Sequence, residues 1–294
     1  MIRDSTLAAS GVPAVAAAIV TRDSVVALHV AGVRRRGNPT PVTLDDRFHI
    51  GSNTKAFTAG LMGLLVDEGR VAWATTLAEL FPELAATMRP EYRAVTVRDL
   101  LTHHGGLVRD ARDAPENEPG RAAAARAAGD HQHRLRPARE PRQGRPAGGA
   151  RAPSPFARVT AMDIDNPPLA DPAGRLNLSI REWARWAQAV LRAASGGASP
   201  WTPTTTGALF TPPVATDSMA MGWQALRRPW AQPGGRILVH DGSNRLFLSV
   251  AVLAPEAGFA VLVVTNQGGS GGDKVIPGLA NRLIRLVTNG QQLH

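Results

Sequence analysis

The sequence contains no cysteine, only two lysines and a single tyrosine among its 294 residues. Without cysteine the chain cannot have a disulfide framework, a cysteine-ligated zinc site or a cysteine nucleophile. Its longest apolar-leaning run, Leu7 to Val20, is interrupted by Ser10, Gly11 and Pro13 and is too short to span a membrane. The run also lacks the basic start of a secretion signal. We therefore expect no membrane span and a cytoplasmic location, or a periplasmic or secreted one if the N-terminus has been trimmed.

The basic charge is concentrated in the middle of the chain. The formal net charge is +9, and residues 109–158 hold 11 arginines against 6 acidic residues. Between Asp110 and Pro155, Leu135 is the only bulky apolar residue, which is too little to offset the entropy of ordering the segment. We predict that residues 110–158 form a low-complexity, disordered or poorly packed segment. Residues 110–155 contain no aromatic side chain for base stacking and no binding motif, so we expect no specific nucleic-acid partner.

Both flanks of this segment have the patterns of folded protein. Runs rich in β-forming residues predict strands at Ala14–Val20, Ser24–Val33, Met221–Leu226, Arg236–Val239, Leu246–Ala254 and Phe259–Asn266. Apolar spacing predicts helices, the third of them with a capping box, at Thr54–Glu68, Val97–Thr102, Ser179–Ala194 and Ile276–Val287. The order of these elements predicts an α/β (α+β) fold, with one antiparallel sheet built from both chain ends and flanked by helices. We expect residues 1–294 to form a single domain, and interpret the Arg34–Arg36 run as a solvated loop.

Ser52 and Lys55 form the first candidate for chemistry. They lie three residues apart at the start of a predicted helix, and this spacing puts both side chains on one face. The helix N-terminus favours a developing negative charge, and an uncharged lysine amine can take the serine proton, which makes an acyl-transfer nucleophile. Arginine cannot serve as that base, and Lys55 is one of only two lysines in the chain. A structural alternative is equally open at this point, in which Ser52 only caps the helix and Lys55 is a surface residue.

The sequence contains several motifs that occur in the same order in a known protein family. They are residues 48–59 around Ser52, Val95–Leu107 with its Leu-Leu-Thr-His signature, the segment 171–191, Val239–Asn244 with its His-x-Gly pattern, and Val261–Asn266. Together they resemble the serine β-lactamase and penicillin-binding-protein superfamily, most closely its class C and esterase-like branch. The resemblance implies a β-lactamase/transpeptidase-like fold with a depleted helical subdomain.

The resemblance also implies a reaction and a role for individual residues. The reaction is hydrolysis of a small-molecule ester, amide or β-lactam through an acyl-serine intermediate. Ser52 is then the nucleophile, Lys55 its base and His240 a polar residue that lines the site. The backbone N–H groups of Ser52 and of Ser243, which follows Gly242, form the oxyanion hole. No cofactor and no metal are implied. Without the resemblance, His240 is more simply a hydrogen-bonded structural residue beside a strand.

One motif of the family is missing. The motif Tyr-x-Asn, or Ser-x-Asn, helps move the proton between nucleophile and leaving group, and it belongs between Leu107 and Pro172. The single tyrosine, Tyr92, precedes that interval, and Ser154 has no asparagine two residues further on. A shifted reading frame over residues 110–158 and a natural loss are both open explanations. We therefore expect weak turnover, and the alternative function is a catalytically inactive homologue, a remnant or binding protein with a basic flexible loop.

The histidines allow a different interpretation, as metal ligands. His103 and His104 are adjacent, whereas two ligands on one helix face are spaced i and i+4. His131 and His133 fall in the segment that is predicted to be poorly packed. We therefore expect no metal site. The oligomeric state is not defined by the sequence.

Overall fold

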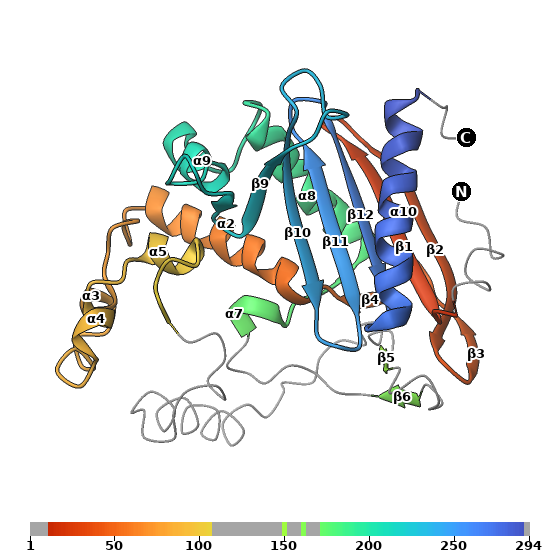
Figure 1. The fold of residues 1–294 in the computed structure, drawn as a ribbon, viewed down its shortest axis with the longest axis horizontal. Coiled ribbons are helices and arrows are strands. Elements are labelled where there is room, and N and C mark those ends of the chain that lie inside the picture. The colour runs from red at the N-terminus through yellow and green to blue at the C-terminus, as the bar shows by residue number, and fades with distance from the viewer. Residues whose placement is uncertain (1–10, 108–148, 152–159, 163–170, 291–294) are drawn as a thin grey trace.

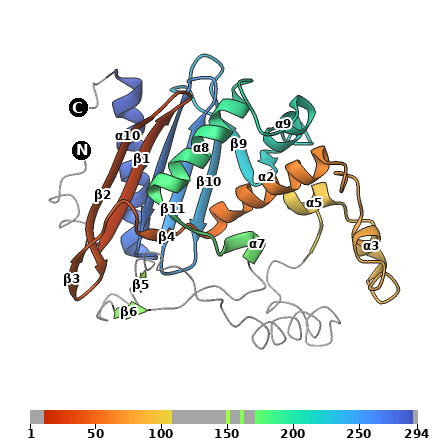
Figure 2. The same cartoon turned by 180° about the vertical axis from the view of Figure 1, so that it is seen from behind.

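The computed structural model describes residues 11–107, 149–151, 160–162 and 171–290. In this part of the chain one large antiparallel sheet has a long helix on each face, α10 (Ser270–Thr288) in front in Figure 1 and α8 (Ile180–Ala194) in front in Figure 2. Further helices gather beside one edge of the sheet (Figures 1 and 2). The predicted antiparallel sheet flanked by helices is thus confirmed.

The main sheet has eight strands in the order β3-β2-β1-β12-β11-β10-β9-β8. Their bounds are β1 Ala14–Thr21, β2 Val25–Arg35, β3 Asn38–Pro41, β8 Met219–Ala220, β9 Trp223–Arg227, β10 Arg236–Ser243, β11 Leu248–Ala254 and β12 Phe259–Thr265. β1 pairs antiparallel with β12, from Val15 opposite Thr265 to Thr21 opposite Phe259. Strands from the two ends of the chain therefore meet in the middle of the sheet, as predicted. Two small sheets pair β4 (Arg47–His49) with β7 (Asn177–Ser179), and β5 (Gly149–Arg151) with β6 (Thr160–Met162).

The central strands are apolar on both faces because helices cover both faces. Along β1, one alternate set of residues joins the core cluster that contains Trp183 and Ala187 of α8. The other set, which includes Ile19, joins a second cluster with Ile276 and Leu283 of α10. Burial of a large apolar side chain contributes about 1.5–3 kcal/mol, so these two clusters hold the helices on the sheet.

The remaining helices lie toward the β8 edge and below the sheet (Figure 1). They are α2 Thr54–Asp67, α3 Leu77–Leu80, α4 Pro90–Arg93, α5 Val97–Leu101, α7 Asp171–Gly174 and α9 Pro203–Phe210. The predicted capping box of α8 is confirmed, since Ser179 Oγ accepts from the Glu182 backbone and the Ser179 backbone donates to Glu182 Oε2 at 2.9 Å. This cap fixes the start of the helix that covers the β1–β12 pair.

Most predicted boundaries differ from the structure by one or two residues, and two differ by more. β10 continues past Val239 to Ser243, because Gly242 and Ser243 still pair with β11. α10 begins at Ser270 instead of Ile276, although Gly271 and Gly272 disfavour helix on propensity. Tertiary packing overrides that propensity, since Gly272 lies so close to Leu248 that a Cβ on it would approach the leucine Cβ to 3.2 Å.

The interpretation of Arg34–Arg36 as a solvated loop is wrong for Arg34 and Arg35, which end β2. Arg34 Nε donates to Asp46 Oδ2 at 2.9 Å, and the same carboxylate oxygen accepts from the Thr43 backbone at 2.7 Å. The Asp46 side chain is 1% exposed, and a buried carboxylate needs such partners. Arg34 therefore pairs with the buried carboxylate of Asp46. The sequence pattern alone does not reveal this pairing.

Several predictions fall outside the described residues. They concern the segment 110–158, with Ser154, His131 and His133 in it. The single-domain prediction for residues 1–294 also stays a prediction. None of the helices in the described part of the chain has both the length and the apolar character that crossing a membrane requires.

Asn266 joins the two ends of the chain at the end of β12. Its Oδ1 accepts from the Ala14 backbone N–H at 2.7 Å, and its Nδ2 donates to the carbonyls of Val33 and Arg34 at 3.2 and 3.1 Å. The residue is fully buried. One amide side chain therefore satisfies backbone groups at the start of β1 and near the end of β2.

We expect Asn266→Ala to lower the free energy of unfolding by about 1–3 kcal/mol or more, because it leaves the buried Ala14 N–H without a partner. Urea denaturation of the purified chain measures this change. Asn38→Ala is the matched control, since Asn38 is exposed and bonds only locally to Thr40; its effect should stay within about 0.5 kcal/mol. Equal effects of the two substitutions would contradict the anchoring role of Asn266.

Candidate active site

Ser52 lies in a single 3₁₀ turn, η1 (Gly51–Asn53), between β4 and α2. Gly51 has φ +54°, a conformation that other residues adopt with strain. A Cβ at Gly51 would collide with the Ser243 backbone nitrogen and would lie 2.7 Å from the Gly242 carbonyl carbon. The turn therefore needs glycine for two reasons, and its backbone lies directly against the end of β10.

Buried hydrogen bonds fix this turn to the sheet. Ser249 Oγ, on β11, donates to the Ile50 carbonyl at 2.8 Å and accepts from Asn53 Nδ2 at 2.9 Å. On the other side, Thr54 Oγ1 donates to the Gly51 carbonyl at 2.7 Å. Ser249 and Asn53 are buried, so these bonds form away from water. The sequence analysis missed both residues, because nothing in the local pattern shows that β11 passes behind the turn.

The side chains of Ser52 and Lys55 meet as their spacing predicts. Lys55 Nζ lies 2.9 Å from Ser52 Oγ, and it also donates to the Ala173 carbonyl in α7 at 2.9 Å. A carbonyl oxygen only accepts, so this second bond takes up one amine hydrogen and orients the nitrogen. Both residues are half-buried, and their side chains are therefore partly shielded from water.

The backbone nitrogens of Ser52 and Ser243 lie close to the same pair of glycines, Gly51 and Gly242. A Cβ at Gly242 would lie 2.9 Å from the Ser52 nitrogen, and one at Gly51 would collide with the Ser243 nitrogen. The Ser52 turn and the end of β10 thus approach each other through glycine backbone on both sides. The two amides that the sequence analysis names are thus brought close together, and their role as an oxyanion hole stays a prediction.

His240 lies on β10, three residues before Ser243. Its Nδ1 is 2.6 Å from the carbonyl oxygen of Asp241, and since that oxygen only accepts, Nδ1 carries the ring proton. Burial lowers the pKa of His240 below the ordinary value of 6.5, and the charges of Lys55 and His103 add to this effect, against the opposing contacts with Asp241. The neutral ring therefore leaves Nε2 as an acceptor.

His103 is a member of this group that the sequence analysis did not assign to it. Partial burial and then the nearby Lys55 charge lower the pKa of His103, and His103 in turn affects His240. His103 has φ +62°, which is uncommon for a residue other than glycine. The Nε2 atom of the adjacent His104 bonds to Asp217 Oδ2 at 2.8 Å. The bond of His104 to Asp217 joins residues far apart in the chain, so the sequence analysis could not find it.

No group of three or more histidine or acidic side chains in the described residues could hold a metal ion. His103 and His104 do not point to one centre, because His104 is engaged with Asp217 and with Thr102 Oγ1. The absence of a metal and of a cofactor stays a prediction.

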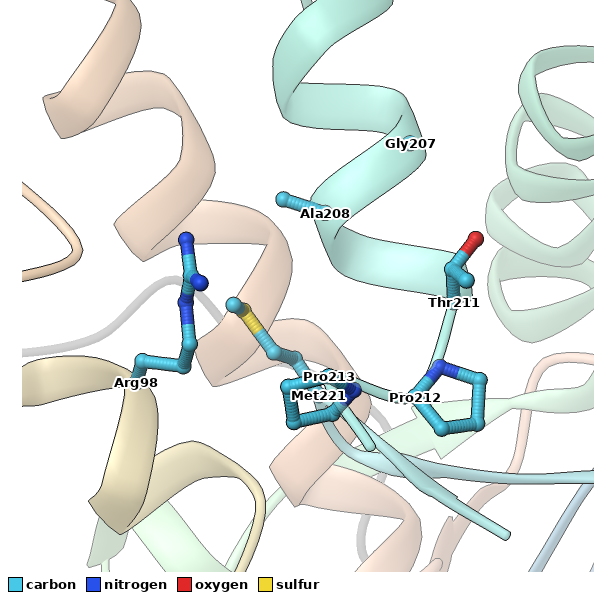
Figure 3. Close-up of a pocket in the computed structure, with 7 residues that line it drawn as sticks. All are labelled: Arg98, Gly207, Ala208, Thr211, Pro212, Pro213 and Met221. Atoms are coloured by element: carbon cyan, nitrogen blue, oxygen red, sulfur yellow. The ribbon is translucent and has the colours of Figure 1, made fainter. Parts of the chain in front are cut away.

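A separate pocket of about 200 Å³ lies between α5, α9 and the turn before β9 (Figure 3). The residues that line it are Arg98, Gly207, Ala208, Thr211, Pro212, Pro213 and Met221. None of the residues around Ser52 takes part in it. Met221 lines the pocket, while the next residue, Gly222, lies against the backbone of Lys55 and Ala56. The pocket is therefore separate from the group of side chains around Ser52.

Comparisons with known proteins agree with this architecture. A protein-family model described as Beta-lactamase matches residues 4–143. The unguisins hydrolase ungD' of Aspergillus campestris (strain IBT 28561) is 25% identical over 290 residues, which covers 77% of this chain and 54% of that protein. Penicillin-binding protein 4 of Amycolatopsis lactamdurans is 38% identical over 80 residues, 27% of this chain and 21% of that protein. The chain thus spans about half, or less, of the length of these curated relatives.

Solved structures share the fold over nearly the whole chain. A class C β-lactamase from Rhodobacter sphaeroides has a TM-score of 0.69 at 20% identity, covering 98% of both chains. The D-alanine carboxypeptidase AmpC from Burkholderia cenocepacia has a TM-score of 0.68 at 17% identity, covering 98% of this chain and 96% of the other. The fold is the β-lactamase/transpeptidase-like fold that the motifs predict. These matches, together with the ordered motifs, support a place for the chain in the serine β-lactamase and penicillin-binding-protein-like superfamily.

Proposed function

We propose that the chain is a serine hydrolase that cleaves a small acyl compound, preferentially an ester, through an acyl-Ser52 intermediate. The observation that carries this proposal is the 2.9 Å distance between Lys55 Nζ and Ser52 Oγ at the start of α2. Hydrolases occur among the relatives of this fold, as the name of the unguisins hydrolase states. The contacts around Ser52 support the further steps.

In the proposed first step, Ser52 Oγ attacks the substrate carbonyl carbon while its proton passes to the uncharged amine of Lys55. The Ala173 carbonyl holds one amine hydrogen, so the nitrogen lone pair is directed at the serine hydroxyl. The charge that develops on the substrate oxygen faces the backbone N–H groups of Ser52 and Ser243. Pre-oriented donors of this kind are typically worth about 10²–10³ in kcat each.

His240 has a supporting role in this proposal. With Nδ1–H bound to the Asp241 carbonyl, its Nε2 accepts a hydrogen bond from substrate or from the attacking water. Its pKa lies below the ordinary histidine value, so the ring stays neutral at pH 7 and gains its charge only in acid. A protonated ring would lose that acceptor, so acidification would weaken this role.

Ester substrates are favoured because an activated ester leaves with little need for a proton. An amide or β-lactam nitrogen must be protonated as it leaves, and the family motif that serves this transfer is missing from the interval between Leu107 and Pro172. A positioned acid–base group is typically worth about 10²–10⁴-fold in rate. The proposed activity is therefore highest for aryl esters and lowest for β-lactams.

The first prediction from this proposal concerns covalent labelling by a fluorophosphonate probe. We expect one probe molecule per chain, on Ser52, at a rate that Lys55→Met lowers by about 10²–10⁴-fold because the proton acceptor is lost. Intact-mass spectrometry with peptide mapping measures both the rate and the site.

Matched controls for this experiment are present in the chain. Lys274→Met removes the other lysine, which is exposed on α10, and Ser24→Ala removes an exposed serine of the β1–β2 turn. Both should label like the wild type. Labelling that survives Ser52→Ala would overturn the proposed nucleophile.

The second prediction compares p-nitrophenyl acetate with the β-lactam nitrocefin on one preparation. We expect slow hydrolysis of the ester and negligible turnover of nitrocefin, because only the nitrogen leaving group depends on protonation. Initial rates at several substrate concentrations give kcat/KM for both. Efficient nitrocefin turnover would contradict the ester preference, and a complete lack of Ser52-dependent hydrolysis would favour the alternative of an inactive homologue.

A further inference from the structure

His49 is a buried histidine, 2% exposed, at the end of β4, and no step of the proposed reaction uses it. Its Nδ1 atom lies 3.0 Å from the backbone nitrogen of Gly51, in a buried hydrogen bond. Since a backbone N–H only donates, Nδ1 is the acceptor in this bond and carries no proton. A buried imidazole ring therefore holds the peptide group that leads into the Ser52 turn.

The same peptide group is held at its other end by Ser249. The carbonyl of the peptide between Ile50 and Gly51 accepts from Ser249 Oγ at 2.8 Å, while the N–H of that peptide donates to His49. Ser249 is fully buried, so both bonds form away from water. Two side chains from β4 and β11 thus hold one peptide plane by both of its polar groups.

The fold also fixes the position of the His49 ring. The backbone of His49 lies opposite Asn177 in the pairing of β4 with β7. The centroid of its ring lies 6.0 Å from that of Phe247, with an angle of 35° between the ring planes. Phe247 is in the connection between β10 and β11, so the imidazole packs against the hairpin that also carries Ser249. A ring that is fixed in this way holds its hydrogen-bond partner in one orientation.

Gly51 is the reason that this peptide group needs to be held. Gly51 has no Cβ and a φ of +54°, so the peptides on both sides of it rotate more freely than they would beside another residue. The peptide that follows carries the N–H of Ser52, and its carbonyl accepts from Thr54 Oγ1 at 2.7 Å. His49 and Ser249 therefore fix one side of Gly51, and Thr54 fixes the other. Together these bonds set the direction of the Ser52 N–H.

We propose that His49 is a positioning residue of the Ser52 site, which holds the Ile50–Gly51 peptide and thereby directs the Ser52 N–H. This inference rests on the proposed function, in which that N–H donates to the negatively charged oxygen of the tetrahedral intermediate. Such a donor accelerates the reaction only if it is already aimed at the place where the charge develops. Loss of the His49 acceptor therefore slows the chemical step and leaves substrate binding almost unchanged.

The test separates the acceptor atom of His49 from the ring that carries it. His49→Phe keeps a flat ring against Phe247 and removes the acceptor. His49→Asn gives up the ring and keeps an acceptor, since the asparagine Oδ1 takes the place of Nδ1. With p-nitrophenyl acetate as substrate, we expect His49→Phe to lower kcat about 10-fold or more while KM changes less than about 3-fold. We expect His49→Asn to keep kcat within about 3-fold of the wild type.

Two further measurements keep the test independent of folding and of activity. His29→Phe is the matched control, because it makes the same substitution in β2, which β1 and β12 separate from β11; it should change kcat less than about 2-fold. Hydrogen exchange of the Gly51 amide, followed by NMR, reports on the bond to His49 directly. Exchange should be slow in the wild type and in His49→Asn, and about 10-fold or more faster in His49→Phe, which leaves the N–H without its acceptor.

The possible outcomes distinguish the positioning role from the proposed function. Suppose that Ser52→Ala abolishes hydrolysis, but both His49 variants lower kcat equally, His49→Phe keeps the wild-type kcat, or the change is mainly in KM. The positioning role is then overturned and the proposed function stands. Equal exchange of the Gly51 amide in the wild type and both variants overturns the positioning role as well. If hydrolysis survives Ser52→Ala or is absent from the wild type, both proposals are overturned.

Discussion

The close approach of two glycine backbones, at Gly51 and Gly242, determines the geometry of everything around Ser52. A Cβ on either residue would collide with the chain of the other, and Gly51 needs a positive φ as well. Because the contact is made without side chains, the backbone nitrogens of Ser52 and Ser243 come close to this pair of glycines. The 3₁₀ turn, the first turn of α2 and the end of β10 are then fixed relative to each other, and Ser249 and Asn53 secure that arrangement from behind.

The site is therefore a junction of segments that are far apart in the chain. The turn at Ser52 supplies the hydroxyl, α2 the amine, α7 a carbonyl that orients the amine, and β10 an amide and an imidazole. The turn at Gly222 joins the end of α5, through the Leu101 carbonyl, to the first turn of α2. Each contributing group is held by backbone contacts, so the arrangement does not depend on long flexible side chains except that of Lys55. Such rigid placement of donors and acceptors is what acyl transfer requires.

The parts of this arrangement that are local in sequence could be predicted, and the parts that depend on tertiary contacts could not. The meeting of Ser52 with Lys55 follows from helical spacing, and the cap of α8 follows from Ser179 and Glu182. The position of Ser243 beside Ser52 was available only through the family resemblance, because no local rule relates residues so distant. The sequence offered His103 only as a candidate metal ligand, and adjacent histidines do not share a helix face. Its positive φ and the bond of His104 to Asp217 have no signature in the sequence.

The pairing of β1 with β12 has a consequence for the way the chain acquires its structure. The bond from Ala14 to Asn266 joins residues 252 positions apart, and the bond by which Ser249 supports the Ser52 turn at Asn53 spans 196 positions. During synthesis the N-terminal hairpin and the Ser52 segment emerge long before the strands that complete them. Contacts of such long range make folding slow, because the chain entropy is lost before the contacts compensate it. Until β10, β11 and β12 have left the ribosome, β1 has an unpaired edge and the Ser52 turn has no sheet behind it. This interval is therefore the one in which the chain is most exposed to misassembly and to chaperones.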